Sequence, residues 1–520
     1  MKKHWGWGLA DSALTEQEIR DTVPLVIEQL GFGGSEVQMP VPLESAQLPA
    51  PRLKPGDLAD ITVADRRNRA VHALGKAYRD VVRGFRGDFA NAPDFVAYPR
   101  SERDVERVLE WADTQHAAVI PYGGGTSVVG GVEPRGLEAY NGIVSLDVSH
   151  MDRVLEVDVA SRAASVQAGA AGPVVEEQLK QRGLTTRFFP QSFEFSTVGG
   201  WIATRAGGHY ASGPTHIDDM VESIRAITPR GLWESRRLPA SGAGPSPDRL
   251  LLDSEGALAV ITQAWLRVVP RPEYKQGASM RLPDFAAGCE ALREVLHAGL
   301  SPANCRLIDG EEAPGDDPRP LLVLGFEGSL DVAAELSAAQ RICRKHAAED
   351  IAESAADSWR GAFLQAPYLR DILVSVGVMA ETFETATTWD RLDGLISDVR
   401  DAAQSAVIEV CGRPGRVTCR LTHVYTDGAA PYFTVLAPVA RGEEIDAWDA
   451  IKVRVSDALL AAGGTITHHH GVGRDHMPWY DQQRPEPFAA ALRAAKNAVD
   501  PAGLLNPGVL VGLNHRRAAD

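Results

Sequence analysis

Pro-Tyr-Gly-Gly-Gly-Thr-Ser, residues 121–127, follows a predicted strand at 117–121 and is followed in turn by Gly130 and Gly131. Glycine lets backbone N–H groups turn toward an anion and lets a phosphate approach without meeting a Cβ atom. The stretch is not a Walker A loop, because it contains no lysine, and it is not a GxGxxG motif, because Val128 takes the third glycine position. On its own, this glycine loop fits either a phosphate site or a plain turn.

Two later segments are also rich in small residues and hydrogen-bond donors. Residues 191–208 read QSFEFSTVGGWIATRAGG, and residues 255–261 read EGALAVI. Three such segments, separated by predicted secondary structure, suit a long, doubly phosphorylated cofactor that lies extended across a sheet. They are less expected for a mononucleotide.

In this order, the three segments resemble the FAD-binding segments of the vanillyl-alcohol-oxidase-type (PCMH-type) flavoproteins. In members that hold flavin covalently, a histidine follows two glycines of the first loop, and Gly125 stands there in this chain. The resemblance therefore implies non-covalent FAD. Ala259 departs from the family, which has glycine at that point. The implied cofactor-binding residues are Pro121, Tyr122, Gly123, Gly124, Gly125, Thr126, Ser127, Gln191, Ser192, Phe193, Glu194, Phe195, Ser196, Thr197, Thr204, Arg205, Ala206, Gly207, Glu255, Gly256, Ala257, Leu258, Ala259, Val260 and Ile261.

Composition limits the compartment and the partners. The chain has 53 Lys and Arg against 69 Asp and Glu, a formal net charge of −16, so we expect no nucleic-acid partner. Its five cysteines include no Cys-x-x-Cys pair, which argues against a disulfide framework and a zinc knuckle. No apolar run is long enough for a signal peptide or a membrane span, and no peroxisomal address ends the chain. We expect a cytoplasmic protein.

Periodicity along the chain predicts an α+β fold in four parts. Residues 1–90 form an N-terminal extension with a proline-rich linker. Residues 91–272, with a helix after Ser101 and several short strands, correspond to a PCMH-type FAD-binding domain. Residues 273–450 alternate Ala-rich helices with strands and correspond to a cap (substrate) domain, an antiparallel sheet flanked by helices. Residues 451–520 carry a histidine cluster and return to the FAD domain.

The histidine cluster lies in residues 463–474, GGTITHHHGVGR. In an extended segment, His468 and His470 point one way and His469 the other. A His-x-His pair can ligate a metal, but no Cys, Asp or Glu cluster nearby completes a coordination set, so we predict none. The segment fits either a polar surface loop or a pocket in which imidazoles transfer protons or contact an anion, and we favour the pocket.

Two predicted strands around Asp427-Gly428 indicate a hairpin and carry Tyr425 and Tyr432. Either tyrosine fits a hydrophobic core as well as a site, and without other context the core is favoured, because aromatic residues mainly supply buried area.

Two arginines, Arg306 and Arg370, stand in otherwise apolar stretches. A buried guanidinium is either paired or faces a cavity. The available partners nearby in the sequence are Asp309 and Asp371, so a structural ion pair and a site residue stay equal alternatives.

A second resemblance covers nearly the whole chain. WGWG (5–8), YLRDI (368–372), AETFETATTWDRL (380–392), RLTHVYTDGAAPYF (420–433), GGTITHHHGVGRDHMPWY (463–480) and VDPAGLLNPG (499–508) resemble the alkyldihydroxyacetonephosphate synthase family, FAD enzymes of ether-lipid synthesis, in order and spacing. The resemblance implies Tyr432 as proton donor and acceptor and Arg370 as the substrate-binding arginine. It also implies an active-site cluster of His468, His469 and His470, and an arginine required for activity, Arg306.

The family exchanges the acyl group of an acyl-dihydroxyacetone phosphate for a long-chain alcohol, through a flavin N5 adduct and without net redox change. The implied partners are these lipid substrates, with peripheral membrane contact and a homodimer as further expectations. An alternative from the same architecture is an FAD-dependent dehydrogenase or oxidase of a 2-hydroxy acid or another alcohol. A flavin-binding scaffold without activity is a third reading, which the Tyr, His and Arg set disfavours.

Overall fold

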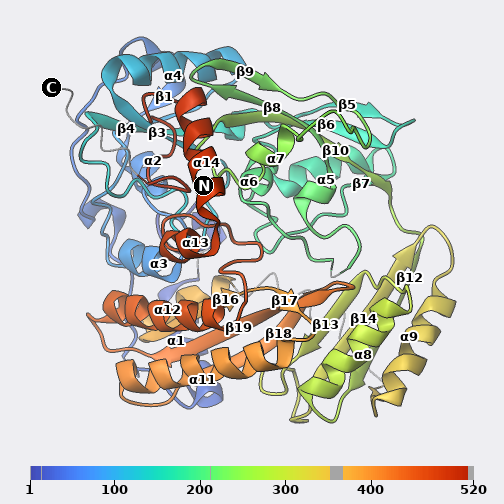
Figure 1. Ribbon diagram of the computed structural model, residues 1–520. Coiled ribbons are helices and arrows are strands. Elements are labelled where there is room, and N and C mark those ends of the chain that lie inside the picture. Colours follow the sequence, from blue (N-terminus) through green and yellow to red (C-terminus); the bar gives the residue numbers. More distant parts are fainter. Residues whose placement is uncertain (1, 13, 35, 211, 352–366, 513–520) are drawn as a thin grey trace.

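The computed structural model describes residues 2–512 except 13, 35, 211 and 352–366. The ribbon in Figure 1 forms two lobes, with sheets and helices of residues 62–270 at the top and one large sheet with its helices at the bottom. Strand pairs of both parallel and antiparallel type occur with helices packed beside them, which confirms the α+β expectation.

A small sheet places the glycine loop. Its strands run in the order β1 (Thr62–Val63), β2 (Phe95–Ala97), β4 (Gly142–Asp147) and β3 (Ala117–Tyr122). The helix predicted after Ser101 is α4 (Glu102–Gln115), and the Ser101 hydroxyl accepts from the Asp104 N–H as an N-cap. Strand β3 pairs in parallel with β4 and ends at Tyr122, where the glycine loop begins.

A second, antiparallel sheet completes the first lobe. Its order is β5 (Val154–Asp158), β6 (Ala163–Gln167), β10 (Val260–Arg267), β8 (Val221–Thr228) and β9 (Gly231–Glu234). Alongside it lie α5 (Gly172–Lys180), α6 (Val198–Ala203), α7 (Asp248–Leu251) and the short pair β7 (Leu184–Thr185) and β11 (Val269–Pro270). Trp201 on α6 is buried in the core of this lobe.

The second lobe is one antiparallel sheet covered by helices. Its order is β15 (Glu349–Ile351), β12 (Tyr274–Arg281), β14 (Leu321–Gly328), β13 (Asn304–Ile308), β18 (Arg416–Val424), β19 (Gly428–Pro438) and β16 (Val378–Glu384), and β17 (Thr387–Thr388) pairs with β19. The predicted hairpin is β18–β19. The helices are α8 (Phe285–His297), α9 (Ala333–Lys345), α11 (Leu392–Cys411) and α12 (Glu444–Ala461).

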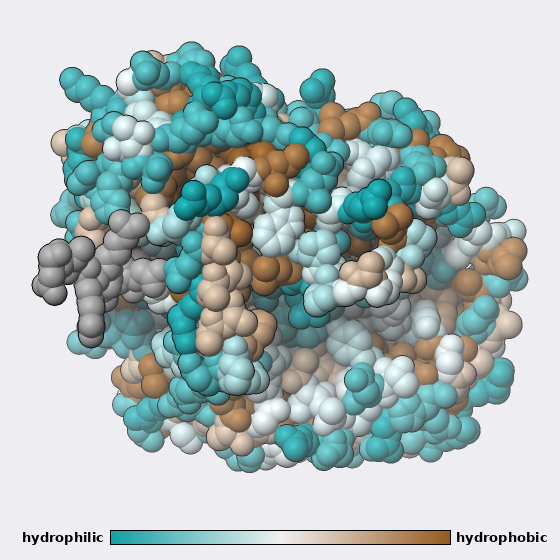
Figure 2. All heavy atoms as spheres, turned by 45° about the horizontal axis from the view of Figure 1, so that its top comes forward, coloured by the Kyte–Doolittle hydropathy of each residue, from teal (hydrophilic) through white to brown (hydrophobic). Residues whose placement is uncertain are grey.

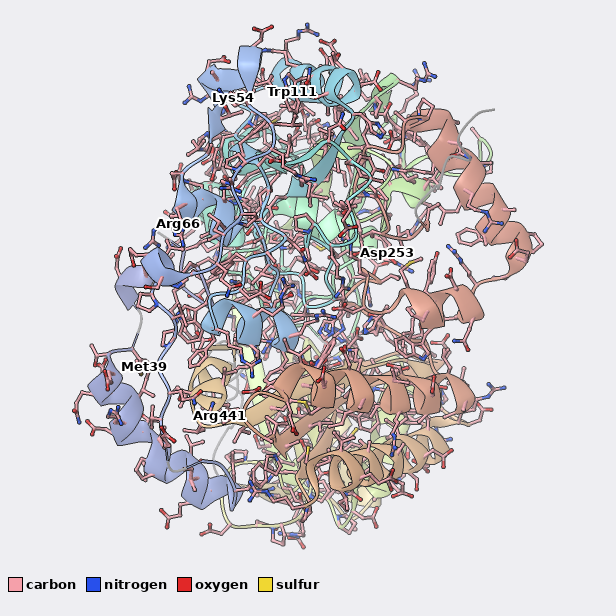
Figure 3. All side chains as sticks on the ribbon, turned by 90° about the vertical axis from the view of Figure 1, so that its left-hand side faces the viewer. Met39, Lys54, Arg66, Trp111, Asp253 and Arg441 are labelled. Atoms are coloured by element: carbon pink, nitrogen blue, oxygen red, sulfur yellow. The ribbon has the colours of Figure 1, made fainter. Side chains whose placement is uncertain are left out.

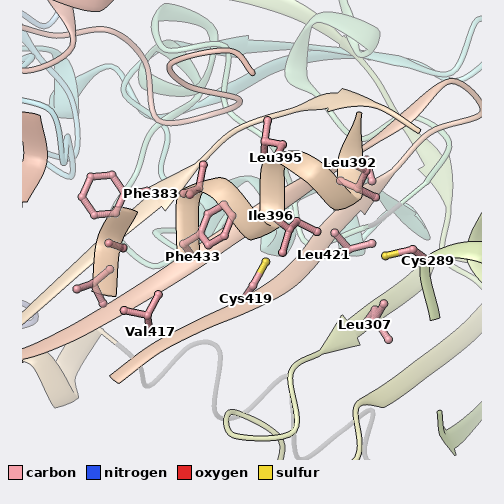
Figure 4. Close-up of a cluster of buried hydrophobic side chains, with 14 of the residues drawn as sticks. Cys289, Leu307, Phe383, Leu392, Leu395, Ile396, Val417, Cys419, Leu421 and Phe433 are labelled. Carbon is pink, nitrogen blue, oxygen red and sulfur yellow. The ribbon is translucent and has the colours of Figure 1, made fainter. Parts of the chain in front are cut away.

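Strand alternation divides the two faces of this sheet. Phe433 of β19 and Cys419 and Leu421 of β18 point to the α11 side and form the core shown in Figure 4. Their neighbours, Tyr432 among them, line a cavity on the other face. Tyr432 is therefore a cavity residue and not part of the hydrophobic core.

The N-terminal residues form more regular structure than their proline content predicts. Helix α1 (Glu16–Leu30) packs against residues 372–378 of the second lobe. Helix α2 (Arg66–Val71) follows, and α3 (Tyr78–Phe85) contributes to the core of the second lobe. Figure 3 shows this part of the chain along one side of the molecule, from Met39 to Lys54 at the far end of the first lobe and back to Arg66 between them.

The C-terminal residues return to the first lobe through α13 (Met477–Gln483) and α14 (Glu486–Val499). Asn506 donates from its side-chain amide to the carbonyl oxygens of Gly131, at 2.9 Å, and Glu255, at 2.6 Å. The remaining elements are the 3-10 helices Ala10–Ser12, Leu43–Ser45, Gly56–Ile61, Val148–His150 and Ile217–Asp219. Within the described part of the chain, every helix is too short or too polar to cross a bilayer.

Candidate active site

A cavity of about 540 Å³ lies between the two lobes. The glycine loop, residues 190–208 and residues 255–261 form its wall in the first lobe. In the second lobe the wall is the face of β16, β18 and β19 that lies opposite α11, together with the helical segment 367–375. The three segments singled out for a cofactor thus meet in one space.

The predicted cofactor residues divide into two groups. Those that line the cavity are Pro121, Tyr122, Gly123, Gly124, Gly125, Thr126, Ser127, Gln191, Ser192, Ser196, Thr197, Thr204, Ala206, Gly207, Glu255, Gly256, Ala259, Val260 and Ile261. Those outside its lining are Phe193, Glu194, Phe195, Arg205, Ala257 and Leu258.

The glycine loop packs closely against other parts of the chain. A Cβ atom at Gly124 would collide with the carbonyl of Phe195, and one at Gly125 would collide with the Tyr122 hydroxyl. Gly125 also has φ +71°, which a side chain rarely adopts. Glycine at these positions therefore lets the loop pack closely against residues 122 and 195 while it lines the cavity.

Several predicted cofactor residues have structural contacts of their own. Arg205 donates to Asp218, and its side chain is 53% exposed. The ring of Phe195 meets Trp7 edge-on, with centroids 5.5 Å apart. The Glu194 carboxylate accepts a hydrogen bond from Tyr368. These contacts hold the loops that surround the cavity.

Glu255 connects the first lobe to the histidine loop, residues 463–474. Its carboxylate accepts the backbone N–H groups of Val472 and Gly473, both at 2.8 Å. Burial raises the pKa of Glu255 to about 8, although these two N–H donors oppose the shift.

The histidine loop is not an extended strand. The backbone N–H groups of His468, His469 and His470 all donate to the Glu384 carboxylate, at 2.7, 3.1 and 3.0 Å. Three successive N–H groups reach one acceptor only when the chain curls around it, so the predicted alternation of side chains is wrong. Burial alone would raise the pKa of Glu384, but the neighbouring imidazoles lower it well below its usual range.

Curling of the loop gives the three imidazoles different surroundings. His469 and His470 line the cavity beside Tyr432, whereas His468 lies behind them. Burial lowers the pKa of His470 to about 3 and that of His468 well below its usual range.

Tyr432 lies at the centre of the second-lobe wall. The Arg420 guanidinium stands 4.2 Å from the centre of its ring, and the ring of His469 stacks on it at a centroid distance of 6.3 Å. Burial raises the pKa of Tyr432, and the charge of Arg420 opposes that shift.

Both predicted arginines face the cavity, and neither forms the ion pair considered from the sequence. Arg306 is 2% exposed and donates to the carbonyl oxygens of Thr422 and His209, while Asp309 pairs with Arg400. Burial lowers the pKa of Arg306 to about 10.

Asp371 is likewise engaged elsewhere, since it accepts from Lys3 and from the backbone N–H of Trp7. The Nε of Arg370 is buried and has no hydrogen-bond partner among the described residues. Arg370 therefore offers an unused donor to the cavity it lines.

Sequence reasoning missed three residues of this site: Glu384, Arg420 and His423. Arg420 pairs directly with Tyr432 across the β18–β19 hairpin, a relation that the hairpin register contains. His423 lines the cavity because the register shifts between Leu421 and His423, a bulge that no sequence signal announces.

Comparisons with known proteins agree with this geometry. Residues 93–235 match the model of the FAD binding domain, and residues 271–510 match that of the C-terminal domain of FAD linked oxidases. Alkyldihydroxyacetonephosphate synthase of Dictyostelium discoideum is 31% identical over 492 residues, which cover 88% of this chain and 80% of that protein. The chain belongs to the alkyldihydroxyacetonephosphate synthase family.

Solved structures support the same assignment. A structure of alkyldihydroxyacetonephosphate synthase matches with a TM-score of 0.80 and 26% identity, covering 97% of this chain and 98% of that one. p-Cresol methylhydroxylase matches with a TM-score of 0.66 at 13% identity, over 97% and 98% of the chains, and shares the fold. The family uses the PCMH-type fold, and FAD is its cofactor.

Proposed function

We propose that the protein exchanges the acyl group of an acyl-dihydroxyacetone phosphate for a long-chain alcohol, the activity that the family name implies. The observation that carries the proposal is a single cavity in which the FAD-binding segments face Tyr432, Arg306, Arg370 and the histidine loop. When bound, FAD supplies covalent catalysis without net oxidation or reduction.

The arginines suit the phosphate of the substrate. A dianion approaching a protein of net charge −16 needs local positive charge, and a guanidinium matches phosphate geometry. The unpartnered Nε of Arg370 supports a role in holding this group. Arg306, whose donors are turned to backbone carbonyls, adds its charge from β13.

Tyr432 is the group that we assign to proton transfer at the substrate carbon. Its hydroxyl belongs to a ring placed between Arg420 and His469. A cation on the ring face stabilises the phenolate, which is the form that accepts a proton. His469 and His470 lie beside this ring in the same cavity, at centroid distances of 6.3 and 5.9 Å.

Apolar residues extend the cavity away from this centre. They are Leu369, Leu373, Ala380 and Leu436. This wall supports a place for an acyl or alkyl chain.

The proposal also includes non-covalent binding of FAD, peripheral contact with membranes and a homodimer. Glycine at position 125, where covalent attachment would need a histidine, supports non-covalent FAD. A lipid substrate supports peripheral contact with membranes, although apolar side chains on the face in Figure 2 occur as small groups among hydrophilic ones. Vesicle flotation tests that contact, and light scattering tests the expected homodimer.

One anaerobic experiment tests the activity. The FAD-loaded protein is mixed with palmitoyl-dihydroxyacetone phosphate and hexadecanol, and flavin absorbance and lipid products are followed together. We expect alkyl-dihydroxyacetone phosphate and free palmitate without an external electron acceptor. A parallel sample receives D-lactate in place of the lipids. Lasting bleaching of the flavin in that sample, with no alkyl product from the lipids, would assign the protein to the FAD-linked dehydrogenases instead.

The variant Tyr432→Phe sharpens this test. It removes the hydroxyl and keeps the buried ring, so FAD remains bound while alkyl product falls by roughly 100-fold or more. Tyr274→Phe, at an exposed tyrosine, is the matched control and keeps full activity. Loss of FAD from Tyr432→Phe would contradict the assigned role.

A further inference from the structure

Four side chains form a continuous row from the cavity wall toward the surface. His469 Nδ1 is 3.0 Å from His468 Nδ1, and His468 Nε2 is 2.7 Å from the Tyr425 hydroxyl. The same hydroxyl is 3.1 Å from His216 Nε2. His469 lines the cavity, whereas His216 is half-buried at the other end, next to the exposed side chain of Arg205.

We propose that His469, His468, Tyr425 and His216 form a proton relay between the cavity and bulk solvent. This inference rests on the proposed function, in which Tyr432 takes a proton from the substrate carbon and later returns one. A proton held in a closed cavity goes back to the same carbon, whereas a relay lets it exchange with water.

Each link of the row provides one donor and one acceptor. With protons on His469 Nδ1, His468 Nε2, the Tyr425 hydroxyl and His216 Nδ1, every link of the row has one donor and one acceptor. In this state the His469 Nδ1 proton also faces the Glu384 carboxylate, at 3.3 Å, and the His216 Nδ1 proton faces the Arg205 carbonyl oxygen, at 3.3 Å. When a proton from the cavity adds to His469 Nε2, each member of the row passes one proton outward and His216 Nδ1 releases one to water. The histidines exchange tautomers, the relay keeps no charge, and the reverse sequence returns a proton to the cavity.

Uncharged imidazoles suit this transfer, because a neutral ring both donates and accepts. Burial lowers the pKa of His216, and the pKa of His468 lies well below its usual range for the same reason. The charged and titratable groups that face His216 are His468, His469, His423, Tyr425, Asp218 and Arg205.

A metal ion is the competing use of these histidines. Ligand atoms of His423, His468 and His469 lie within 4.8 Å of one another. However, His423 Nε2 is 2.9 Å from the Gly208 carbonyl and its Nδ1 is 3.1 Å from the Thr422 hydroxyl. Both ring nitrogens of His468 belong to the row, so an ion would have to break existing hydrogen bonds. The geometry therefore favours the relay.

The test measures exchange of the substrate hydrogen. Wild type and His216→Ala turn over acyl-dihydroxyacetone phosphate in D₂O, and mass spectrometry follows deuterium at the carbon that carried the acyl group. We expect wild type to incorporate deuterium and His216→Ala to slow both exchange and turnover by at least roughly tenfold, with FAD absorbance and KM unchanged. Added imidazole restores His216→Ala, because the truncated site is open to solvent.

Two further variants distinguish transfer from packing. Tyr425→Phe slows exchange less than His216→Ala, since His216 Nε2 also lies 3.1 Å from His468 Nε2 and bypasses the hydroxyl. His346→Ala, at a half-buried histidine that contacts Glu294 away from the cavity, leaves exchange at the wild-type rate.

Three results overturn the relay. If wild type forms alkyl product but His216→Ala retains its exchange rate and pH profile, the relay is wrong and the proposed function stands. If wild type forms no alkyl product, both fail. One tightly held metal ion per chain, lost in His468→Ala, assigns the histidines to a metal site.

Discussion

Arg420 tunes the tyrosine on which the proposed chemistry depends. Its guanidinium stacks on Tyr432 and pairs with Glu312, so its charge is held in place over the ring. Burial raises the pKa of Tyr432 and Arg420 lowers it, while Glu384 and Glu381 add to the rise. The balance of these groups sets the pH at which the phenolate forms.

Replacing this cation shifts the activity to higher pH. Arg420→Met removes the lowering contribution, so the pKa of Tyr432 rises further and the acidic limb of the kcat profile moves up by about one pH unit, or 1.36 kcal/mol. The measurement is kcat against pH. Arg420→Lys keeps a positive charge, so it shifts the acidic limb less. The double variant Arg420→Met, Glu312→Gln removes the charge of Arg420 without leaving the Glu312 carboxylate unpaired. An unshifted limb in both neutral variants contradicts the prediction.

The histidine loop is an element whose shape depends on one carboxylate. Glu384 on β16 accepts three successive backbone N–H groups and the Thr467 hydroxyl, at 2.6 Å. Glu384→Gln replaces one acceptor oxygen by an amide that donates, so N–H faces N–H and the loop opens. We expect loss of turnover by at least roughly 100-fold, with both lobes folded and FAD bound.

Circular dichroism, flavin absorbance and the lipid assay check this loop prediction together. The control is Glu409→Gln, which breaks an exposed ion pair with Arg454 and leaves activity unchanged. Wild-type turnover in Glu384→Gln would show that the loop keeps its shape without the carboxylate.

These elements also show which features of the structure could be predicted from the sequence. Short-range periodicity was enough to predict α4, β3 and the β18–β19 hairpin, because caps, turns and alternation are local features of the sequence. The order of the three predicted FAD segments was enough to expect them in one space, and they line one cavity. The curl around Glu384 and the position of His423 depend on a carboxylate 84 residues away and on a strand bulge, so no local pattern reveals them.

At the scale of the whole molecule, the two lobes share one stretch of chain. Tyr78, Val81 and Phe85 of α3 belong to the core of the second lobe, although this helix precedes the first-lobe strand β2. Sequence periodicity alone describes α3 as part of an extension, because it does not show which lobe receives its apolar side. The second lobe therefore requires residues from outside 273–450 to complete its core.

Truncating one of these side chains therefore affects the stability of both lobes. Phe85 is 5% exposed and meets Trp5 edge-on at 5.2 Å, so Phe85→Ala leaves a cavity that costs roughly 3–5 kcal/mol. Because α3 is continuous with the first lobe and packed in the second, calorimetry should show a single transition that moves to lower temperature as a whole. Leu25→Ala, at a 61% exposed position on α1, should leave it in place. A melt that splits into two transitions, only one of them shifted, would show that each lobe holds its own core.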